Sequence, residues 1–314
     1  MSDSTPPNVI GHQHIWAQLL HWYERNTLPN AVVFQGLQGV GKGALACDFA
    51  ACLVTQNSLD SNAIRHAHHL IRLGAHPGVR VLRRDNSGEE GTHISIAKVR
   101  EVLHFFRMSP ERASDYRVLI VDAIDDLSVA GANTLLKIVE EPPDHVCIII
   151  INHRSERLLP TLKSRAAQLF FNPLSSEEMK DYCMINNFSS QDTLLSLVQG
   201  QPGLMKHIHA HGLTRYLEDV HILVTNDGTK TTIGQFIKSW FSAANKAMWD
   251  HQLMWIERTL LQQGSQERGM TPRFARLMQT YDNFVKNITH YRTLNLDLSS
   301  ILWQSLSTLW ISER

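Results

Sequence analysis

A glycine-rich stretch carrying one lysine is the part of this sequence best suited to phosphate chemistry. Gly36, Gly39 and Gly41 lead to Lys42 and then Gly43, which matches the G-x-x-x-x-G-K pattern of a phosphate-binding loop. In such a loop the backbone N–H groups bind phosphates, the lysine reaches the outer phosphates, and a Ser or Thr after it coordinates Mg²⁺. Gly43 has no hydroxyl. The sequence therefore predicts a loop that keeps its lysine and lacks its metal ligand.

The segments around this loop have the patterns of a strand and a helix. The apolar run Ala31-Val32-Val33-Phe34 precedes the loop, and a helical pattern over 43–54 follows it. The N-terminus of that helix would point at a bound phosphate. The alternative is a strand-to-helix turn that binds nothing. Whether a nucleotide still binds stays open at this point.

A carboxylate at the end of a second strand could complete the same site. The apolar strand Arg117–Val121 is followed by Asp122, which is the position of a Walker-B aspartate supporting Mg²⁺. Enzymes that hydrolyse nucleotides at a phosphate-binding loop place a glutamate directly after this aspartate, to polarise the attacking water. Here the next residue is Ala123. Asp125 and Asp126 lie beyond the strand end, and we do not expect either carboxylate to replace that glutamate. Many strands end in aspartate, but its combination with the loop favours a degenerate nucleotide site without intrinsic ATP hydrolysis.

Length, charge and cysteine content limit the domain number, the partners and the cellular location that this protein can have. The 314 residues suffice for two or three domains, and 30 basic against 30 acidic residues give no bulk attraction to nucleic acid or membranes. The chain shows no secretory signal core and no apolar run long enough to cross a membrane. Four scattered cysteines in apolar runs indicate reduced core thiols rather than a disulfide framework: Cys47, Cys52, Cys147 and Cys183. We expect a cytoplasmic protein.

Strand and helix patterns alternate through the first half of the chain and become wholly helical in the second. This alternation predicts an α/β fold with a parallel sheet covered by helices on both faces. The predicted strands are Ala31–Phe34, Val79–Leu82, Arg117–Val121, Val146–Ile151 and Gln168–Phe171, and the predicted helices lie near 13–25, 43–54, 94–107, 128–140 and 157–163. Acidic residues after Ser175 predict another helix start, and the stretch 200–203 separates two later helices. Residues 226–228 and the stretch from Gly264 to Pro272 are predicted to be later loops.

Several strings, taken together, carry a family resemblance. They are Ile10-Gly11-His12, His76-Pro77-Gly78, the run from Ala132 to Pro143 that contains N-L-L-K-x-x-E-E-P-P, Asn152, the run from Arg157 to Arg165, and Gly200-Gln201-Pro202-Gly203. In order and spacing they resemble the delta-prime subunits of bacterial DNA polymerase III clamp loaders, which are AAA+ proteins. The resemblance covers roughly residues 8–210, and the rest of the chain fits by length and helical character alone.

The resemblance implies an architecture and a set of partners. It implies an AAA+ core at 1–172, a helical lid at 173–212 and a helical collar at 213–314 that builds a pentameric ring. The implied neighbours are gamma/tau and delta subunits, and the assembled complex would act on the sliding clamp and primed DNA within a DNA polymerase holoenzyme. Contact of this chain with DNA is weakly signalled, by Lys98, Arg100 and Arg107 on one predicted helix and by Arg83-Arg84 before an acidic and polar loop.

The resemblance also implies a role for one arginine. Delta-prime subunits of this family do not hydrolyse ATP and donate an arginine to a neighbour's ATP. Ser164-Arg165 matches the family's Ser-Arg-Cys motif, with Ala166 in place of the cysteine. Arg165 is thus the candidate arginine finger, a group that contributes about 10³–10⁵ in rate when supplied in trans.

Departures from the family pattern concern the chain's own site and a metal. The lid arginine of active relatives is Leu204 here, and Asn152 fits the sensor position. Many relatives carry a four-cysteine zinc module where this chain has residues 55–75 without a cysteine. That region holds His66, His68 and His69, with His76 just beyond, but they lack the thiolates and spacing of a structural zinc site. We expect no zinc and no required cofactor.

Two other functions remain alternatives. One is an active AAA+ ATPase, such as a gamma/tau-like motor, which Gly43, Ala123 and Leu204 argue against. The other is a nucleotide sensor that binds ATP through Lys42 without cleaving it.

Overall fold

The computed structural model describes most of the chain in two compact units. The described residues are 10–56, 60–83, 94, 96–107, 116–127, 129–153, 158–225, 230–242, 249–267, 269–294 and 297–310. The first unit comprises Met1–Phe188 with Gln199–Leu204, and the second comprises Ser189–Val198 with Met205–Arg314. The division into core, lid and collar stays a prediction.

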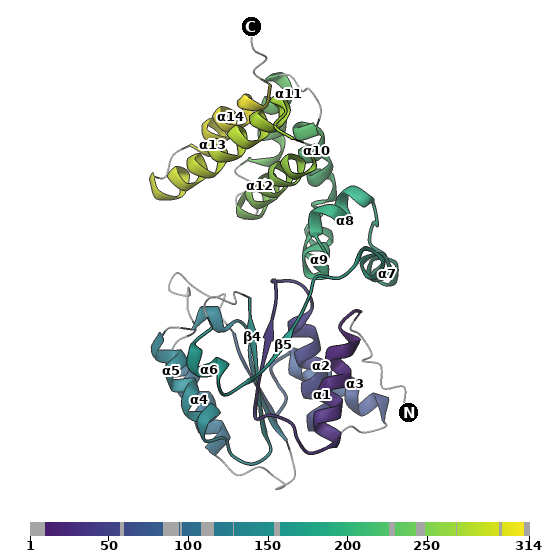
Figure 1. Cartoon of the computed structure of the whole chain (residues 1–314), viewed down its shortest axis with the longest axis vertical. Coiled ribbons are helices and arrows are strands. Elements are labelled where there is room, and N and C mark those ends of the chain that lie inside the picture. The colour runs from purple at the N-terminus through teal and green to yellow at the C-terminus, as the bar shows by residue number, and fades with distance from the viewer. Residues whose placement is uncertain are drawn as a thin grey trace. The chain divides into compact units, whose positions relative to one another are not determined.

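A five-stranded parallel sheet forms the centre of the first unit (Figure 1). Its strands lie in the order β2-β3-β4-β1-β5, and all four pairings are parallel. The strands are β1 (Ala31–Gln35), β2 (Val79–Leu82), β3 (Arg117–Val121), β4 (Val146–Asn152) and β5 (Ala167–Phe170). The predicted α/β class is confirmed. The last strand begins and ends one residue earlier than predicted.

Helices cover both faces of this sheet because its central strands are apolar on both sides. Val32 and Phe34 pack with residues of α1, α2 and α3, whereas Val33 packs with residues of α4, α5 and α6. Figure 1 shows these two groups of helices on opposite sides of the strands. They are α1 (Gln13–Glu24), α2 (Lys42–Val54), α3 (Ser61–Arg72), α4 (Ile96–Arg107), α5 (Val129–Glu140) and α6 (Pro160–Lys163). Arg157, the expected start of α6, lies outside the described residues.

The α3 helix is missing from the sequence prediction, although its signals are present. Asp60 caps its N-terminus by accepting a hydrogen bond from the Asn62 N–H at 2.8 Å. Ala67 and Ile71, four residues apart, are buried in the core against α2. Five other positions of this helix are histidine or arginine, and they interrupt the apolar pattern that would have indicated the buried face.

The predicted helix start after Ser175 is confirmed. The Ser175 hydroxyl accepts a hydrogen bond from the Glu178 N–H, and the Glu178 carboxylate accepts one from the Ser175 N–H, which together form a capping box. This start belongs to α7 (Ser176–Asn186) in the first unit. The next helices, α8 (Asp192–Val198) and α9 (Pro202–Ala210), are separated at residues 199–201, near the predicted break.

The described part of the second unit is helical, as predicted. After α9 it contains α10 (Thr214–Thr225), α11 (Lys230–Trp240), α12 (Trp249–Gln266), α13 (Pro272–Leu294) and α14 (Leu298–Leu306). Trp255 is fully buried and the Tyr216 hydroxyl donates to the Gln252 carbonyl at 2.6 Å, whereas Trp303 is 39% exposed. The prediction that a loop begins at Gly264 was wrong, because Gly264 lies inside α12. None of the described helices combines the length and apolarity that a membrane span requires.

Candidate functional site

The phosphate-binding loop connects the carboxyl end of β1 to the first turn of α2, as the sequence predicts. Gly36, Gly39 and Gly41 all have positive φ angles of 149°, 84° and 112°. A Cβ on Gly36 would lie 2.3 Å from the Phe171 carbonyl oxygen, so the adjoining segment leaves room for glycine only. The loop backbone is therefore held in its curved shape by conformations that favour glycine.

Lys42 is buried and bound to the loop that precedes it. Its side chain is 2% exposed, and its Nζ donates to the Gly36 carbonyl and, at 2.6 Å, to the Leu37 carbonyl. These carbonyls satisfy the ammonium group at the position where a phosphate-binding lysine acts. A phosphate would have to compete with them for Nζ.

The structure brings the predicted Walker-B residue to the same edge of the sheet. Asp122 directly follows β3, and Asn152 ends β4, the strand between β3 and β1. Since all strands are parallel, these residues and the loop lie at their shared carboxyl edge. Burial first, and then the charges of Asp48 and Asp122, raise the pKa of the Cys47 thiol on α2 to about 11. Asp122 is therefore close enough to α2 for its charge to influence the Cys47 thiol.

The two positions that depart from an active site differ in their local structure. A Cβ on Gly43 would meet only the Ile151 Cδ1 atom, at 3.9 Å, so there is space for the hydroxyl side chain that the sequence lacks. Ala123 is buried and has φ 82° and ψ 92°, a conformation that L residues rarely adopt. Asp126 lies in the 3₁₀ turn that follows, and its backbone carbonyl accepts a hydrogen bond from the Ile94 N–H. The side chain of Asp125 lies outside the described residues.

Two segments distant in sequence hold the loop, and neither was predicted to have this role. The His12 Nε2 atom pairs with the Val40 carbonyl at 3.0 Å, and the His12 ring lies 4.7 Å from the Phe171 ring. On the other side, the Gly203 N–H donates to the Gly39 carbonyl at 2.8 Å. The strings containing His12 and Gly203 carried the family resemblance, but neither signals its partner. The loop is thus tied to the start of α1 and to the start of α9.

The contact with α9 predicts opposite effects on stability for alanine at two glycines, each of which is the second residue of a helix. A Cβ on Gly203 would lie 2.9 Å from the Gly39 Cα, so Gly203→Ala is expected to destabilise the first unit by about 1–3 kcal/mol through overpacking. Gly43→Ala, at the same position of α2 with open space, is expected to stabilise it by about 0.5–1 kcal/mol. Thermal unfolding of both variants checks the opposite signs. Equal shifts would show that the Gly39–Gly203 approach does not constrain the fold.

The His12 contact predicts a dependence of stability on pH. Burial lowers the pKa of His12 below its ordinary 6.5, so the folded chain favours the neutral ring. Below pH 6.5 the unfolded chain takes up this proton more readily than the folded chain. The His12 contribution is therefore complete above pH 6.5 and is lost as the pH falls toward the lowered folded pKa. Urea unfolding at pH 7.5 and 5 should show a smaller acid loss for His12→Asn, whose side chain tolerates the φ of 59° at this position.

Arg165 lies at the opposite edge of the sheet from the loop. It precedes β5, and the register that pairs Val32 with Ala167 places it level with Asn30, at the amino end of β1. Gly36 is six residues further along β1, which corresponds to roughly 20 Å at the rise of a strand. The predicted site residues therefore form two groups: the loop and Asp122 at one edge, and Arg165 at the other.

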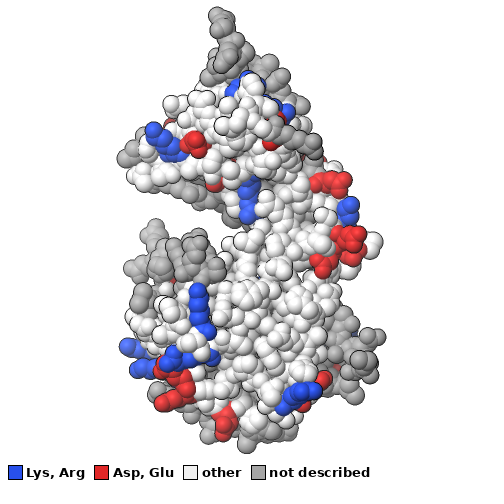
Figure 2. Space-filling view, in the orientation of Figure 1, with Lys and Arg blue, Asp and Glu red and all other residues white. Residues whose placement is uncertain are grey.

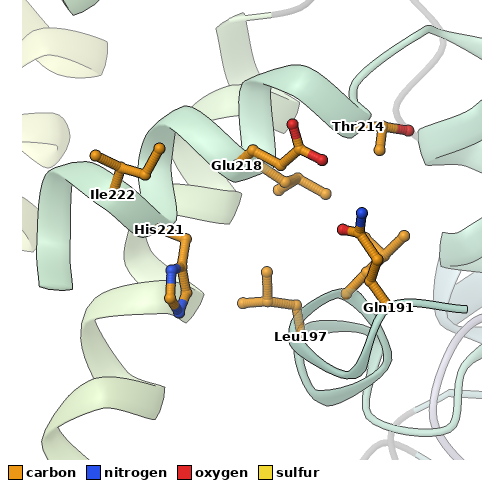
Figure 3. Close-up of a pocket in the computed structure, with 8 residues that line it drawn as sticks. Gln191, Leu197, Thr214, Glu218, His221 and Ile222 are labelled. Atoms are coloured by element: carbon orange, nitrogen blue, oxygen red, sulfur yellow. The ribbon is translucent and has the colours of Figure 1, made fainter. Parts of the chain in front are cut away.

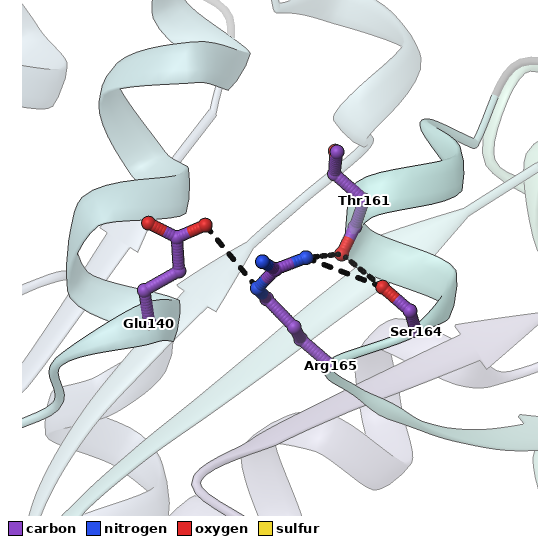
Figure 4. Close-up of polar contacts among 4 residues, drawn as sticks. All are labelled: Glu140, Thr161, Ser164 and Arg165. Carbon is purple, nitrogen blue, oxygen red and sulfur yellow. Dashed lines mark hydrogen bonds and ion pairs between the residues drawn. The ribbon is translucent and has the colours of Figure 1, made fainter.

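The Arg165 guanidinium is partly exposed and has three partners among the residues that the structure describes (Figure 4). Its Nε lies 3.2 Å from the Glu140 Oε1, and its Nη1 donates to the Thr161 carbonyl and the Ser164 hydroxyl at 3.3 Å each. Side-chain exposure is 43% for Arg165 and 45% for Glu140. The arrangement fixes a cation at the surface.

The histidines considered for zinc lie on or just after α3. His68 Nε2 is 3.1 Å from the Asp48 Oδ1, so this ring pairs with a buried carboxylate of α2. The His76 Nδ1 accepts a hydrogen bond from the Gly78 N–H at 3.1 Å. No group of three or more His, Cys, Asp or Glu side chains within the described ranges is arranged to hold a metal ion.

Charges of both signs are interspersed on the face drawn in Figure 2. Of the residues considered for DNA contact, Lys98 donates to the Arg83 carbonyl at 3.2 Å and Arg100 is exposed. Arg84 and the side chain of Arg107 lie outside the described residues. DNA contact stays a prediction.

A pocket in the second unit contains none of the predicted site residues (Figure 3). Helix α10 supplies one wall and α8 with the residue before it supplies the other. Its lining residues are Gln191, Leu194, Leu197, Thr214, Leu217, Glu218, His221 and Ile222. Four of the eight lining residues are aliphatic, and the others supply one amide, one hydroxyl, one carboxylate and one imidazole.

Comparison with known proteins finds a matching family model and relatives that each cover more than half of the chain. The sequence model of a family described as "DNA polymerase III, delta subunit" matches residues 11–175. DNA polymerase III subunit delta' of Pseudomonas aeruginosa is 29% identical over 207 residues, which are 64% of this chain and 61% of that protein. DNA polymerase III subunit gamma/tau of Mycobacterium tuberculosis is 31% identical over 174 residues, 55% of this chain and 29% of that protein.

A solved structure agrees over a longer part of the chain. It is a DNA polymerase III, gamma subunit-related protein of Thermotoga maritima, with a TM-score of 0.54 and 16% identity. The match covers 93% of this chain and 98% of that one. At this identity the likeness concerns the fold alone.

Proposed function

This chain belongs to the DNA polymerase III, delta subunit family and has an α/β fold of the AAA+ class, and from this premise we propose that it is a delta-prime-like clamp-loader subunit. It would complete a hetero-pentamer with gamma/tau and delta subunits through a helical collar at 213–314. The assembled complex would load the sliding clamp on primed DNA as part of a DNA polymerase holoenzyme. In that complex this subunit would not hydrolyse ATP and would supply Arg165 to a neighbouring ATP.

The position of Arg165 carries this proposal. Roughly 20 Å of strand separates it from the chain's own phosphate-binding loop, which is too far for one side chain to span. An arginine that acts on a nucleotide from this position must therefore act on one bound by another subunit. Its exposure and its fixed orientation at the surface support that use.

The state of the chain's own loop supports the absence of hydrolysis. Gly43 offers no metal ligand, Ala123 offers no carboxylate, and Leu204 offers no cation at the start of α9. Lys42 Nζ is bound by two loop carbonyls. Phosphoryl transfer depends on positioning and on neutralising charge, and the loss of these groups removes both.

A gamma/tau-like motor is the second candidate, favoured by the match to the Mycobacterium tuberculosis protein. It would need the loop to bind Mg²⁺–ATP and cleave it. A sensor that binds ATP through Lys42 without cleaving it is the third. Titration of the isolated chain with a fluorescent ATP analogue, with and without Mg²⁺, distinguishes a binding loop from a loop that binds nothing.

Reconstitution tests the proposal as a whole. The isolated chain is expected to release no phosphate from ATP, and mixing it with gamma/tau and delta subunits is expected to give one complex in gel filtration whose turnover responds to clamp and primed DNA. Omission of the chain should abolish both the complex and the response. Phosphate release by the isolated chain that Lys42→Ala abolishes would contradict the proposal and support the motor.

A further inference from the structure

Glu140 is the charged partner of Arg165 within the described residues. Its Oε1 lies 3.2 Å from Nε, while the Thr161 carbonyl and the Ser164 hydroxyl accept from Nη1. The Glu140 contact lies on one side of the guanidinium, and the Thr161 and Ser164 contacts lie on the other. Figure 4 shows that they hold the group between α5 and α6. Within the described part of the chain, Nη2 makes no hydrogen bond.

This ion pair is poorly explained by folding stability. Both side chains are more than two fifths exposed, and exposed pairs contribute little because solvent screens them. Glu140 is also the last residue of α5, where the helix dipole disfavours a negative charge. Lys137, one turn earlier on the same helix, forms no ion pair with it in the described structure. The Glu140 carboxylate thus lies beside Arg165 at a helix end where its charge does not stabilise α5.

We propose that Glu140 is a positioning residue for Arg165, a step that rests on the proposed function of Arg165. With Nε and Nη1 held from the chain's own side, the two N–H groups of Nη2 are left to donate to a phosphoryl oxygen on the neighbouring subunit. Fixing the guanidinium before assembly removes much of the rotamer entropy that a free arginine would lose on binding phosphate. Glu140 itself does not touch the nucleotide.

The test uses the reconstituted complex and a neighbouring glutamate as control. Glu140→Ala is expected to lower the kcat of ATP turnover at the site that Arg165 serves by about threefold to tenfold, the scale of the cost of ordering one long side chain. The KM for ATP and complex formation in gel filtration should not change. Glu141→Ala removes the same charge one residue later, from an exposed side chain without a contact to Arg165, and should leave kcat unchanged.

A double-mutant cycle separates this inference from the proposed function. Adding Glu140→Ala to Arg165→Ala should have no further effect, because the group that it positions is gone. If Arg165→Ala alone leaves turnover unchanged, the proposed function fails. If Arg165→Ala lowers turnover while Glu140→Ala matches the Glu141→Ala control, only the positioning role fails. A rise in kcat with Glu140→Ala would also overturn it, because Glu140 would then restrain Arg165 from the phosphate.

Discussion

A clamp loader assembled with Arg165→Ala in this subunit is expected to lose about 10³-fold or more of the ATP turnover at the site facing that side chain. The guanidinium would neutralise charge that develops on the transferring phosphoryl group, and alanine leaves that charge unopposed. The measurement is a rapid phosphate-release burst after clamp and primed DNA are added. The variant should lose the share of the burst that belongs to one site.

Two controls show whether the effect depends on the guanidinium itself. Arg165→Lys keeps the charge but loses the planar fork, and it should recover only a small part of the rate. Lys163→Ala removes an exposed cation from the same helical turn and should behave as wild type. All three variants should assemble normally, because Arg165 is exposed and its ion pair with Glu140 contributes little to folding stability. A full burst from Arg165→Ala would show that this chain is a scaffold.

Gly200→Ala is expected to destabilise the first unit by roughly 2–6 kcal/mol, the sum of an overpacking term and a strained backbone. Its φ is 70°, and a Cβ there would lie 2.3 Å from the Leu174 carbonyl oxygen and 2.7 Å from the Leu174 nitrogen. The same two residues share a backbone hydrogen bond of 2.8 Å from the Leu174 N–H to the Gly200 carbonyl. A methyl group would force this pairing apart and loosen the segment that carries Gly203 to the phosphate-binding loop.

Gly74→Ala is the matched control, because Gly74 also has φ 70° and has no atom within 4 Å of its Cβ position. It should lose only the backbone part, about 1–3 kcal/mol. Hydrogen exchange of the β1 and β5 amides during urea unfolding reports on the first unit, and the α12 amides serve as an internal reference. Equal losses for Gly200→Ala and Gly74→Ala would show that the contact with Leu174 relaxes freely.

Local patterns predicted the sheet and the loop well because both depend on neighbouring residues. The apolar strand β1 and the G-K string after it are contiguous, and so are β3 and Asp122. The capping box after Ser175 is likewise a spacing of three residues. Helix α3 shows the limit of this approach, since its histidines and arginines conceal an apolar face that packing makes evident.

Contacts between distant segments could not be predicted from one sequence. His12 with Val40, and Gly39 with Gly203, join residues far apart along the chain, and nothing in either residue type specifies its partner. The pairing of Glu140 with Arg165 is of the same kind. The sequence motif identified Arg165 as a candidate, but the strand register was needed to show that it lies far from the chain's own loop.

The most direct test compares Lys42→Ala with Arg165→Ala, each introduced into this subunit alone within the reconstituted complex. Phosphate release is measured at saturating clamp and primed DNA. We predict that Lys42→Ala matches wild type, since the chain's own loop takes no part in hydrolysis, whereas Arg165→Ala loses the burst share of one neighbouring site. The reverse order, with turnover lost through Lys42→Ala and retained by Arg165→Ala, would show that this chain is itself a motor.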